Sequence, residues 1–472
     1  MPDSELCFMS AVDLARAMRR GLVSAVEVMR AHLAQIERVN PRVNAVCTLV
    51  AEQALAQARA ADEARARRAR LGPLHGLPVG IKDARPTKGI RTTQGSPIYK
   101  DYVPDHDSIQ VERLKAAGAI IVGKTNLPEF STGGQTFNAL FGVTRNPYDP
   151  ERTCGGSSGG SGVGVACGMF PLGDGSDTGG SLRIPAGYNN VVGLRPSPGR
   201  VPVWPAALGW STQHVQGPMA RSVDDAALML SVTAGPDPRS PIALPEPGTY
   251  FARPLERDFS RVRIAWSRNL GRYPVEPVVT QVLEAQRATF ERLGCVVEEA
   301  DPDLSEADEI FNVLRCDYAA LTLHEDYRRH PDLIGAHLIP VIEQGLRQDA
   351  LSVSKAESRR TALFLRFQAF MQRYEYLVLP VSPAPPFSVQ EKYLTHIAGQ
   401  KLDNLFTWCG LTYAISLAGH PAVSVPGGFT PEGLPVGLQI VGRHQQDLAV
   451  LQLAHAFEAA TGFGQRHPPL AR

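Results

Sequence analysis

The segment 153–162 reads TCGGSSGGSG, and the segment 173–183 reads GDGSDTGGSLR. Glycine adopts positive φ without steric penalty, so the backbone N–H groups of such segments can turn toward a common point. Serines held among inward-pointing N–H groups are suited to act as a nucleophile beside an oxyanion hole. Flexible linkers have a similar composition, so the surrounding sequence has to decide between a site and a linker. We expect a helix and a strand between the two segments.

Short apolar runs alternate with helical patterns around these segments. The runs rich in β-branched residues, each predicted to be a strand, are 77–81, 119–122, 376–381, 422–425 and 436–441. The helical patterns are 109–117, 222–232 and 446–460. Strands that alternate with helices predict a layered α/β fold with a largely parallel or mixed sheet.

Residues 10–70 are predicted to be helical. Ser10 and Ser24 precede apolar positions at three- and four-residue spacing and are candidate N-caps. Pro41 is predicted to end the second helix, and an alanine-rich stretch from Ala51 to Arg70 to form a third. Two proline-rich irregular stretches, 235–260 and 382–400, are long enough to be loops over a site.

Composition and charge indicate an ordinary globular protein. The chain has 472 residues, 43% hydrophobic and 20% charged, with a formal net charge of +1, which gives no reason to expect a nucleic-acid partner. Seven scattered cysteines without a CxxC pair fit a reducing compartment. The N-terminus lacks the pattern of a signal peptide, and no apolar stretch approaches the ~20 residues that span a bilayer. We therefore expect a soluble cytoplasmic protein without a membrane partner.

The segment 118–125 (GAIIVGKT) matches the phosphate-binding pattern GxxxxGK[ST]. In a phosphate-binding loop the variable positions belong to the loop that follows a strand. Here those positions are Ala, Ile, Ile and Val, which indicate the strand itself, and Pro128 follows closely where a helix should begin. We interpret the segment as the end of a strand.

The segment 155–159 (GGSSG) matches the GxSxG nucleophile elbow of α/β-hydrolases. That elbow needs a strand before it, but the preceding segment 146–152 (NPYDPER) is rich in turn-forming residues. His214 and His420 are the histidines available for a Ser-His pair, and we expect each to pack or to face solvent instead.

Lys82 lies in the segment 80–83 (GIKD), at the end of a predicted apolar strand. A lysine in this position can be drawn out of water, which disfavours the ammonium form and lowers the pKa. A surface or ion-paired lysine is the alternative that this segment alone leaves open.

Several blocks of the chain resemble the amidase signature family. They are 76–83 (GLPVGIKD), 125–130 (TNLPEF), 155–161 (GGSSGGS), 177–186 (DTGGSLRIPA), 419–427 (GHPAVSVPG) and 433–439 (GLPVGLQ). The resemblance implies one large α/β domain (1–472) with a central mixed, mostly parallel twisted sheet covered by helices. Within it we expect an N-terminal helical segment (1–70), a catalytic core (71–235), a variable substrate-pocket region (236–400) and a C-terminal return to the core sheet (401–472).

The same resemblance implies a Ser–cis-Ser–Lys triad. Ser181 would be the nucleophile, Ser157 the bridging serine with a cis peptide bond, and Lys82 the base. The implied oxyanion donors are the backbone N–H groups of Thr178, Gly179, Gly180 and Ser181. The implied supporting side chains are Ser158 as a hydrogen-bond partner, Asp177 and Arg183 as a pair that braces the turn, and Ser131 in the pocket wall.

The resemblance predicts an amidohydrolase that cleaves a small amide through an acyl-enzyme on Ser181, without a metal or a cofactor. An ester or a carbamate fits the same triad, because a serine nucleophile beside an oxyanion hole does not demand an amide. The catalytic subunit of a tRNA-dependent glutamine amidotransferase is a further alternative. The segment 311–318 (FNVLRCDY) argues against this alternative, because it departs from the glutamine-sensing motif SNLxRYDG of such subunits. The intact Lys82, Ser157 and Ser181 argue against a non-catalytic protein of the same shape.

The substrate pocket is expected in segments that resemble the family least. The segment 204–210, the region around Cys316 and Tyr318, and the loop 383–408 are candidate pocket walls. Their aromatic and aliphatic residues favour an apolar or aryl group over a charged one, although such residues also form ordinary core. A homodimer is an open alternative to a monomer.

Overall fold

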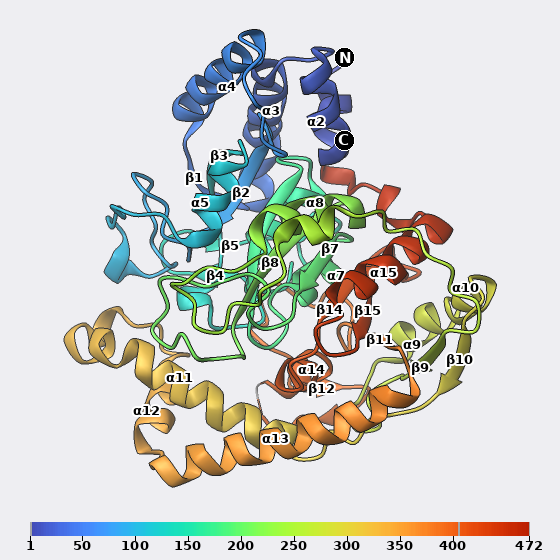
Figure 1. Ribbon diagram of the computed structural model, residues 1–472. Coiled ribbons are helices and arrows are strands. Elements are labelled where there is room, and N and C mark those ends of the chain that lie inside the picture. Colours follow the sequence, from blue (N-terminus) through green and yellow to red (C-terminus); the bar gives the residue numbers. More distant parts are fainter. Residues whose placement is uncertain (1, 405, 472) are drawn as a thin grey trace.

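An eleven-stranded sheet runs through the molecule in the computed structural model, which describes residues 2–404 and 406–471 (Figure 1). In spatial order its strands are β1 (Val46–Leu49), β3 (Ile120–Thr125), β2 (Pro78–Lys82), β6 (Leu172–Asp177), β8 (Val215–Ala220), β7 (Val192–Arg195), β14 (Ala422–Phe429), β15 (Pro435–Gly442), β11 (Tyr376–Pro380), β9 (Arg263–Trp266) and β10 (Val296–Glu299). Two short strand pairs lie outside it: β4 (Phe137–Asn138) with β5 (Gly142–Val143), and β12 (His396–Ile397) with β13 (Gln400–Lys401).

The sheet is mixed. β2 is parallel to β3 and β6, and β9 is parallel to β10 and β11, whereas the other neighbouring pairs are antiparallel. Parallel strands need a crossover, and α5 (Ile109–Ala116) and α6 (Gly159–Ala166) lie in the connections that lead from β2 to β3 and from β3 to β6. The expected α/β fold with a mixed sheet is confirmed. Its antiparallel pairs, among them the β14–β15 hairpin, outnumber the parallel ones.

Helices cover the sheet and lie at both ends of it (Figure 1). One end carries the two chain termini and α2 (Ala11–Arg20), α3 (Ala25–Val43) and α4 (Ala51–Ala66); the other carries α11 (Ala307–Arg329), α12 (Ile339–Arg347) and α13 (Ala350–Arg373). Besides α5 and α6, the other described α-helices are α1 (Asp3–Phe8), α7 (Arg183–Tyr188), α8 (Val223–Thr233), α9 (Pro277–Glu284), α10 (Arg287–Arg292), α14 (Gly410–Leu417) and α15 (Asp447–Thr461). Gln35 Nε2 of α3 donates to the carbonyl oxygen of Ala471 at 3.0 Å, which ties the two ends of the chain together.

The expectations for the N-terminal region are confirmed in part. The Ser10 and Ser24 side chains accept hydrogen bonds from backbone N–H groups in the first turns of α2 and α3, as N-caps do. Pro41 does not end its helix, because a proline in the last turn removes only one N–H donor; α3 continues to Val43 and ends at the left-handed residue Asn44. The predicted all-helical region also omits β1, a four-residue strand whose conformation depends on pairing with β3.

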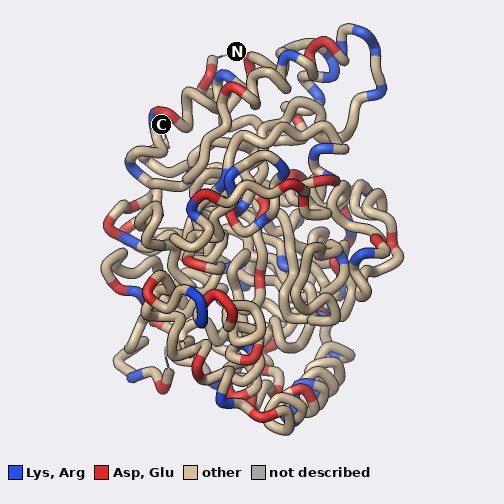
Figure 2. Tube along the Cα trace, turned by 90° about the vertical axis from the view of Figure 1, so that its left-hand side faces the viewer, with Lys and Arg blue, Asp and Glu red and all other residues tan. Residues whose placement is uncertain are grey.

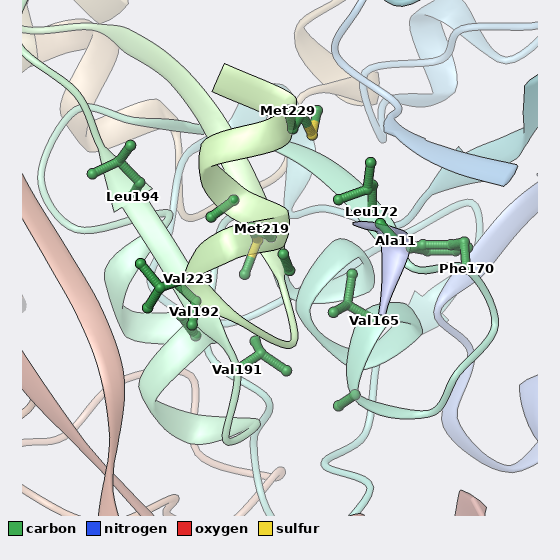
Figure 3. Packing of buried hydrophobic residues seen from close by; sticks show 14 of the residues in the cluster. Ala11, Val165, Phe170, Leu172, Val191, Val192, Leu194, Met219, Val223 and Met229 are labelled. Carbon is green, nitrogen blue, oxygen red and sulfur yellow. The ribbon is translucent and has the colours of Figure 1, made fainter. Parts of the chain in front are cut away.

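Buried side chains fix the position of the strands that carry the glycine-serine segments. Figure 3 shows part of the largest apolar cluster, in which Leu172 of β6 and Met219 of β8 pack near Met229 of α8. Each of these side chains is fully buried, and burial of one such side chain contributes roughly 1.5–3 kcal/mol. The cluster therefore anchors β6 and, with it, the start of the segment that follows Asp177.

Figure 2 shows Lys and Arg interspersed with Asp and Glu along the chain, without a large region of one sign. Among the helices of residues 2–404 and 406–471, none has both the length and the apolar character required to cross a bilayer.

Candidate active site

The glycine-serine sequence folds into two separate loops that meet in space. The first loop contains a cis peptide bond between Gly156 and Ser157 and leads into α6, whereas the second follows β6 and leads into α7. The backbone N–H of Ser158 donates to the carbonyl oxygen of Ser181 at 3.2 Å and joins the loops. A helix and a strand separate the two loops as expected, but α6 (Gly159–Ala166) begins inside the first segment and β6 (Leu172–Asp177) lies mostly inside the second. The linker interpretation is excluded.

Parallel pairing brings the lysine to these loops. Lys82 is the last residue of β2, and Asp177 is the last residue of the parallel neighbour β6. The carboxyl ends of parallel strands lie at the same edge of a sheet, where α/β proteins commonly place their sites. Lys82 thus meets Ser176 of β6, although the two are 94 residues apart in sequence.

The Lys82 side chain is fully buried and contacts three hydroxyl groups. Its Nζ lies 2.7 Å from Ser157 Oγ, 3.1 Å from Ser158 Oγ and 3.1 Å from Ser176 Oγ. The Ser158 hydroxyl donates to the carbonyl oxygen of Ser176 at 3.3 Å and accepts from the backbone N–H of Ser176 at 3.2 Å. The Ser158 proton is therefore directed away from Lys82, and Lys82 is the donor in the Lys82–Ser158 contact.

Burial lowers the pKa of Lys82 well below its ordinary value, and the nearby Arg85 lowers it further, while Asp174 and Asp177 oppose the shift. A neutral lysine amine has two N–H donors and one lone pair. Donation to Ser158 and Ser176 uses both N–H groups, which leaves the lone pair for the hydroxyl proton of Ser157. The geometry therefore accommodates a neutral Lys82 that can accept a proton from Ser157.

Ser181 lines a cavity of about 310 Å³ together with Ser157 and Ser131. The Ser131 hydroxyl is buried and has no hydrogen-bond partner among the described residues. A cavity of this kind, with a few polar groups on a largely apolar wall, is typical of a small-molecule site.

Three of the four expected oxyanion donors are free to bind a ligand. The backbone N–H of Gly180 donates to Asp177 Oδ1 at 2.8 Å and is already occupied. The N–H groups of Thr178, Gly179 and Ser181 donate to no acceptor in the described chain, and all three residues lie in the cavity wall. The expectation for Gly180 is corrected on this point, because its amide holds the Asp177 carboxylate instead.

Asp177 and Arg183 form the expected pair beneath this loop. Both side chains are fully buried, and Arg183 Nη2 lies 2.9 Å from Asp177 Oδ1, with Arg195 Nη1 at 3.3 Å from the same oxygen. Burial alone would raise the pKa of Asp177, but the two guanidinium groups outweigh it and hold that pKa below its ordinary value. The charged carboxylate also accepts from the backbone N–H of Leu182 at 3.2 Å, so it holds the turn on both sides of Ser181.

The structure supports neither a phosphate-binding loop at 118–125 nor a Ser-His pair at the 155–159 segment. Lys124 is buried in β3 and donates to Thr87 Oγ1 at 3.0 Å and Thr92 Oγ1 at 2.9 Å, which confirms a strand rather than a phosphate loop. His420 is buried and packs as expected. His214 lines the cavity, where its Nδ1 lies 3.2 Å from Thr178 Oγ1, and burial lowers its pKa to about 3. No described hydrogen bond joins either histidine to a serine.

The cavity walls match the expected segments only in part. The segment 203–209 and Tyr318 line the cavity, but Trp210 is 73% exposed outside it, and Cys316 is buried behind the wall. From the loop 383–408, only Phe406 among the described residues reaches the cavity. Cys316 is outside the cavity because α11 presents one face to it: residues at three- and four-residue spacing point the same way, and Cys316 lies off that face.

Ser176, His214 and Arg315 line the cavity. Ser176 was not among the predicted site residues, His214 was expected to pack or to face solvent, and Arg315 was covered only by the predicted wall around Cys316 and Tyr318. Ser176 lay inside the glycine-serine stretch, and its position at the end of a strand parallel to the Lys82 strand was the available signal. Arg315 follows Phe311 by one helical turn, but nothing in the sequence indicated which face of that helix meets the site. The described residues contain no group of three or more His, Cys, Asp or Glu side chains that could hold a metal ion.

Comparison with known proteins identifies the class of protein that this fold and site define. The amidase family model matches residues 27–451, and the chain therefore belongs to the amidase signature family of hydrolases, for which a Ser-Ser-Lys triad is characteristic. An aryl acylamidase of bacterial origin has a similar structure, with a TM-score of 0.91 and 28% identity over 97% of this chain and 98% of that chain.

Two relatives of similar sequence have different names. The acylamidase of Rhodococcus erythropolis is 34% identical and covers 99% of this chain and 98% of its own length. The glutamyl-tRNA(Gln) amidotransferase of Moorella thermoacetica has a subunit that is 36% identical and covers 99% of both chains. The family and the amidase chemistry are thus established, whereas the particular substrate has to be argued from the site.

Proposed function

We propose that the chain hydrolyses a small amide through an acyl-enzyme on Ser181. The observation that carries the proposal is the contact of 2.7 Å between the buried Lys82 Nζ and Ser157 Oγ, at a point where Ser157 and Ser181 line one cavity. A nucleophile next to a relay that ends in a desolvated amine is the arrangement that activates a serine without a histidine.

In the proposed mechanism, neutral Lys82 accepts the hydroxyl proton of Ser157, and Ser157 takes the proton of Ser181. Ser181 Oγ forms a bond to the carbonyl carbon, and the carbonyl π electrons move to oxygen. The N–H groups of Thr178, Gly179 and Ser181 stabilise this oxyanion, at about 3–4 kcal/mol for one well-placed donor. The oxyanion electrons then re-form the C=O bond, the C–N bond breaks, and the relay delivers the proton to the departing nitrogen. Water attacks the resulting acyl-enzyme by the same steps, and the ester bond to Ser181 Oγ breaks as the proton returns to Ser181.

The remaining residues of the site act as positioning groups in this proposal. Ser158 and Ser176 accept the two N–H bonds of Lys82 and so orient its lone pair toward Ser157. Asp177 and Arg183 hold the loop that presents Ser181. All of these residues lie within the proposed catalytic core (71–235), whereas α11 of the proposed pocket region (236–400) supplies one wall of the cavity.

Esters and carbamates remain candidate substrates of the same site, since its chemistry does not depend on nitrogen in the leaving group. Glutamine is the substrate expected of an amidotransferase subunit, but the described cavity lining lacks an acidic side chain to bind its ammonium group. Free glutamine carries an ammonium group, and no Asp or Glu is found among the described residues that line the cavity. This observation, with the divergent segment 311–318, favours a small amide without a free amino group.

The test is a hydrolysis screen over aryl amides, aliphatic amides, carbamates, esters and glutamine. Ser181→Ala and Lys82→Met should each lower kcat/KM by at least about a thousandfold, and intact-protein mass spectrometry after rapid quenching should detect an acyl adduct on Ser181. Ser161→Ala is the matched control, because this buried serine of the same segment bonds to Thr125 Oγ1 and the Asp174 carbonyl oxygen instead. Full turnover by Ser181→Ala would refute the mechanism, and a preference for glutamine would refute the substrate assignment.

A further inference from the structure

One face of α11 forms a long wall of the cavity. The residues that line it share three- and four-residue spacing: Phe311, Arg315, Tyr318, Ala319, Thr322 and Leu323. Phe311 packs against the proposed oxyanion loop so closely that a Cβ added at Gly179 would lie 2.7 Å from Phe311 Cζ. Arg315 follows one turn later, about 6 Å along the helix axis. The wall therefore places a guanidinium group a short distance from the proposed reaction centre.

Arg315 is held in place but not neutralised. Its Nη2 donates to Asn312 Oδ1 at 3.2 Å, and its Cζ lies 3.7 Å from the centroid of the Phe406 ring. Its Nε and Nη1 are buried without a hydrogen-bond partner among the described residues. Buried polar groups are nearly always hydrogen-bonded, and an unpaired buried donor on a charged group is costly. Arg315 is thus a cavity-lining residue on which two buried nitrogen atoms, Nε and Nη1, have no hydrogen-bond partner among the described residues.

No negative charge in the cavity balances this group. The described lining residues include no Asp or Glu, and the other arginine among them, Arg85, is paired with Asp174 Oδ2 at 3.2 Å. Burial lowers the pKa of Arg315, and the groups that oppose this shift are Cys316, Cys409 and Tyr413. Burial raises the pKa of each of those three groups, which keeps them neutral near pH 7. The cavity therefore carries an uncompensated positive charge beside its apolar wall.

From these observations we infer that Arg315 binds a carboxylate of the substrate, so that the natural substrate is an amide with an acidic group separated from the scissile bond by a short apolar or aryl body. An arginine binds a carboxylate through charge-assisted N–H bonds, and the Nη1 group of Arg315, which carries two N–H bonds and has no partner among the described residues, can supply such donors. Leu323 and Val341 in the same cavity supply apolar surface. The inference rests on the proposed function and narrows its substrate class.

The test compares two pairs of matched amides, because the carboxylate can belong to the acyl part or to the amine part. Glutaryl para-nitroanilide is compared with hexanoyl para-nitroanilide, and para-acetamidobenzoate with para-isopropylacetanilide. The wild-type protein should prefer the carboxylate in one of the pairs by at least about tenfold in kcat/KM, the least expected for hydrogen bonds to a charged group. The pair that shows the preference identifies the side on which the acid lies.

Arg315→Met should abolish this preference, because it should lower kcat/KM for the carboxylate member of the pair at least about tenfold more than for the neutral member. Arg315→Lys keeps the charge without the fork and should retain only part of the preference. Arg329→Met is the matched control, because it removes the same charge from an exposed position on α11, where Arg329 pairs with Glu325; it should keep the full preference.

Two results would overturn the inference: no preference of the wild-type protein in either pair, or an equal loss for both members of the pair in Arg315→Met. The wild-type comparison decides the matter even if that variant does not fold. A failure of the proposed function would look different from a failure of this inference, because Ser181→Ala would then still hydrolyse the neutral amides.

Discussion

The pH dependence of stability at Lys82 tests the mechanism without a substrate. In the folded protein Lys82 Nζ contacts only hydroxyl groups among the described residues, in a fully buried position, and burial lowers its pKa well below the ordinary value. Between that lowered pKa and about 10.4, the unfolded chain binds one more proton at this residue than the folded chain does. The free energy of unfolding should therefore rise with pH by about 1.4 kcal/mol per unit within this interval.

The Lys82→Met variant lacks this proton. Urea unfolding of both proteins at several pH values should show the wild-type protein gaining nearly 3 kcal/mol relative to Lys82→Met over two pH units inside the interval. The variant also leaves hydroxyl groups without a partner, at a cost of roughly 1–3 kcal/mol each, but this cost shifts the difference by a constant and leaves its slope unchanged. Only the slope reports the protonation state.

Lys100→Met is the control, because it makes the same substitution at an exposed position. Its difference from the wild-type protein should show no comparable slope. A flat difference for Lys82→Met would mean that folded Lys82 keeps its proton near neutral pH, and the reasoning that makes it the base would fail. The companion measurement is kcat/KM, which should rise as the pH passes the folded pKa of Lys82.

Three further perturbations test other parts of the structure. Gly179→Ala places a Cβ 2.7 Å from Phe311 Cζ and should lower kcat about a hundredfold by displacing the proposed oxyanion donors, while an unchanged circular dichroism spectrum shows that the fold is kept. Arg183→Met removes one of the buried partners of Asp177 and should lower the free energy of unfolding by about 3–5 kcal/mol in urea titrations; a loss below about 1 kcal/mol would contradict this role. Burial raises the pKa of Glu458 to about 8, so the folded protein binds the extra proton between about pH 4.3 and 8. Its stability should fall as pH rises through this interval, and Glu458→Gln should remove that fall; an identical pH profile for the variant would refute the assignment.

Sequence similarity to relatives does not identify the substrate of this protein. An acylamidase and an amidotransferase subunit match the chain at similar identity, so overall similarity does not separate the two activities. The cavity does offer a basis for the distinction, because its described lining combines apolar surface with Arg315, two of whose nitrogen atoms are unpaired, and contains no Asp or Glu. The substrate is therefore better sought among acidic amides than inferred from the names of relatives.

The predictions from sequence were accurate where a local pattern carries the physical cause. Apolar runs located β2, β3, β11, β14 and β15, because each runs through the buried interior. The patterns did not predict a strand whose conformation depends on its neighbour. β1 is such a strand, because it is held by antiparallel pairing with β3. The predicted N-cap Ser24 could be recognised because its cause is local: its side chain accepts from the Glu27 N–H within the first turn of α3.

The sequence by itself determined the chemistry of this protein, because the glycine-serine segments and the lysine that ends an apolar strand are local features that match the amidase family. Only the tertiary structure decided which groups are paired. It showed that the Gly180 amide is taken by Asp177, that Ser176 completes the contacts of Lys82, and that Arg315 keeps two buried donors free. Pairing and burial depend on neighbours distant in sequence, and the proposed substrate preference is argued from them.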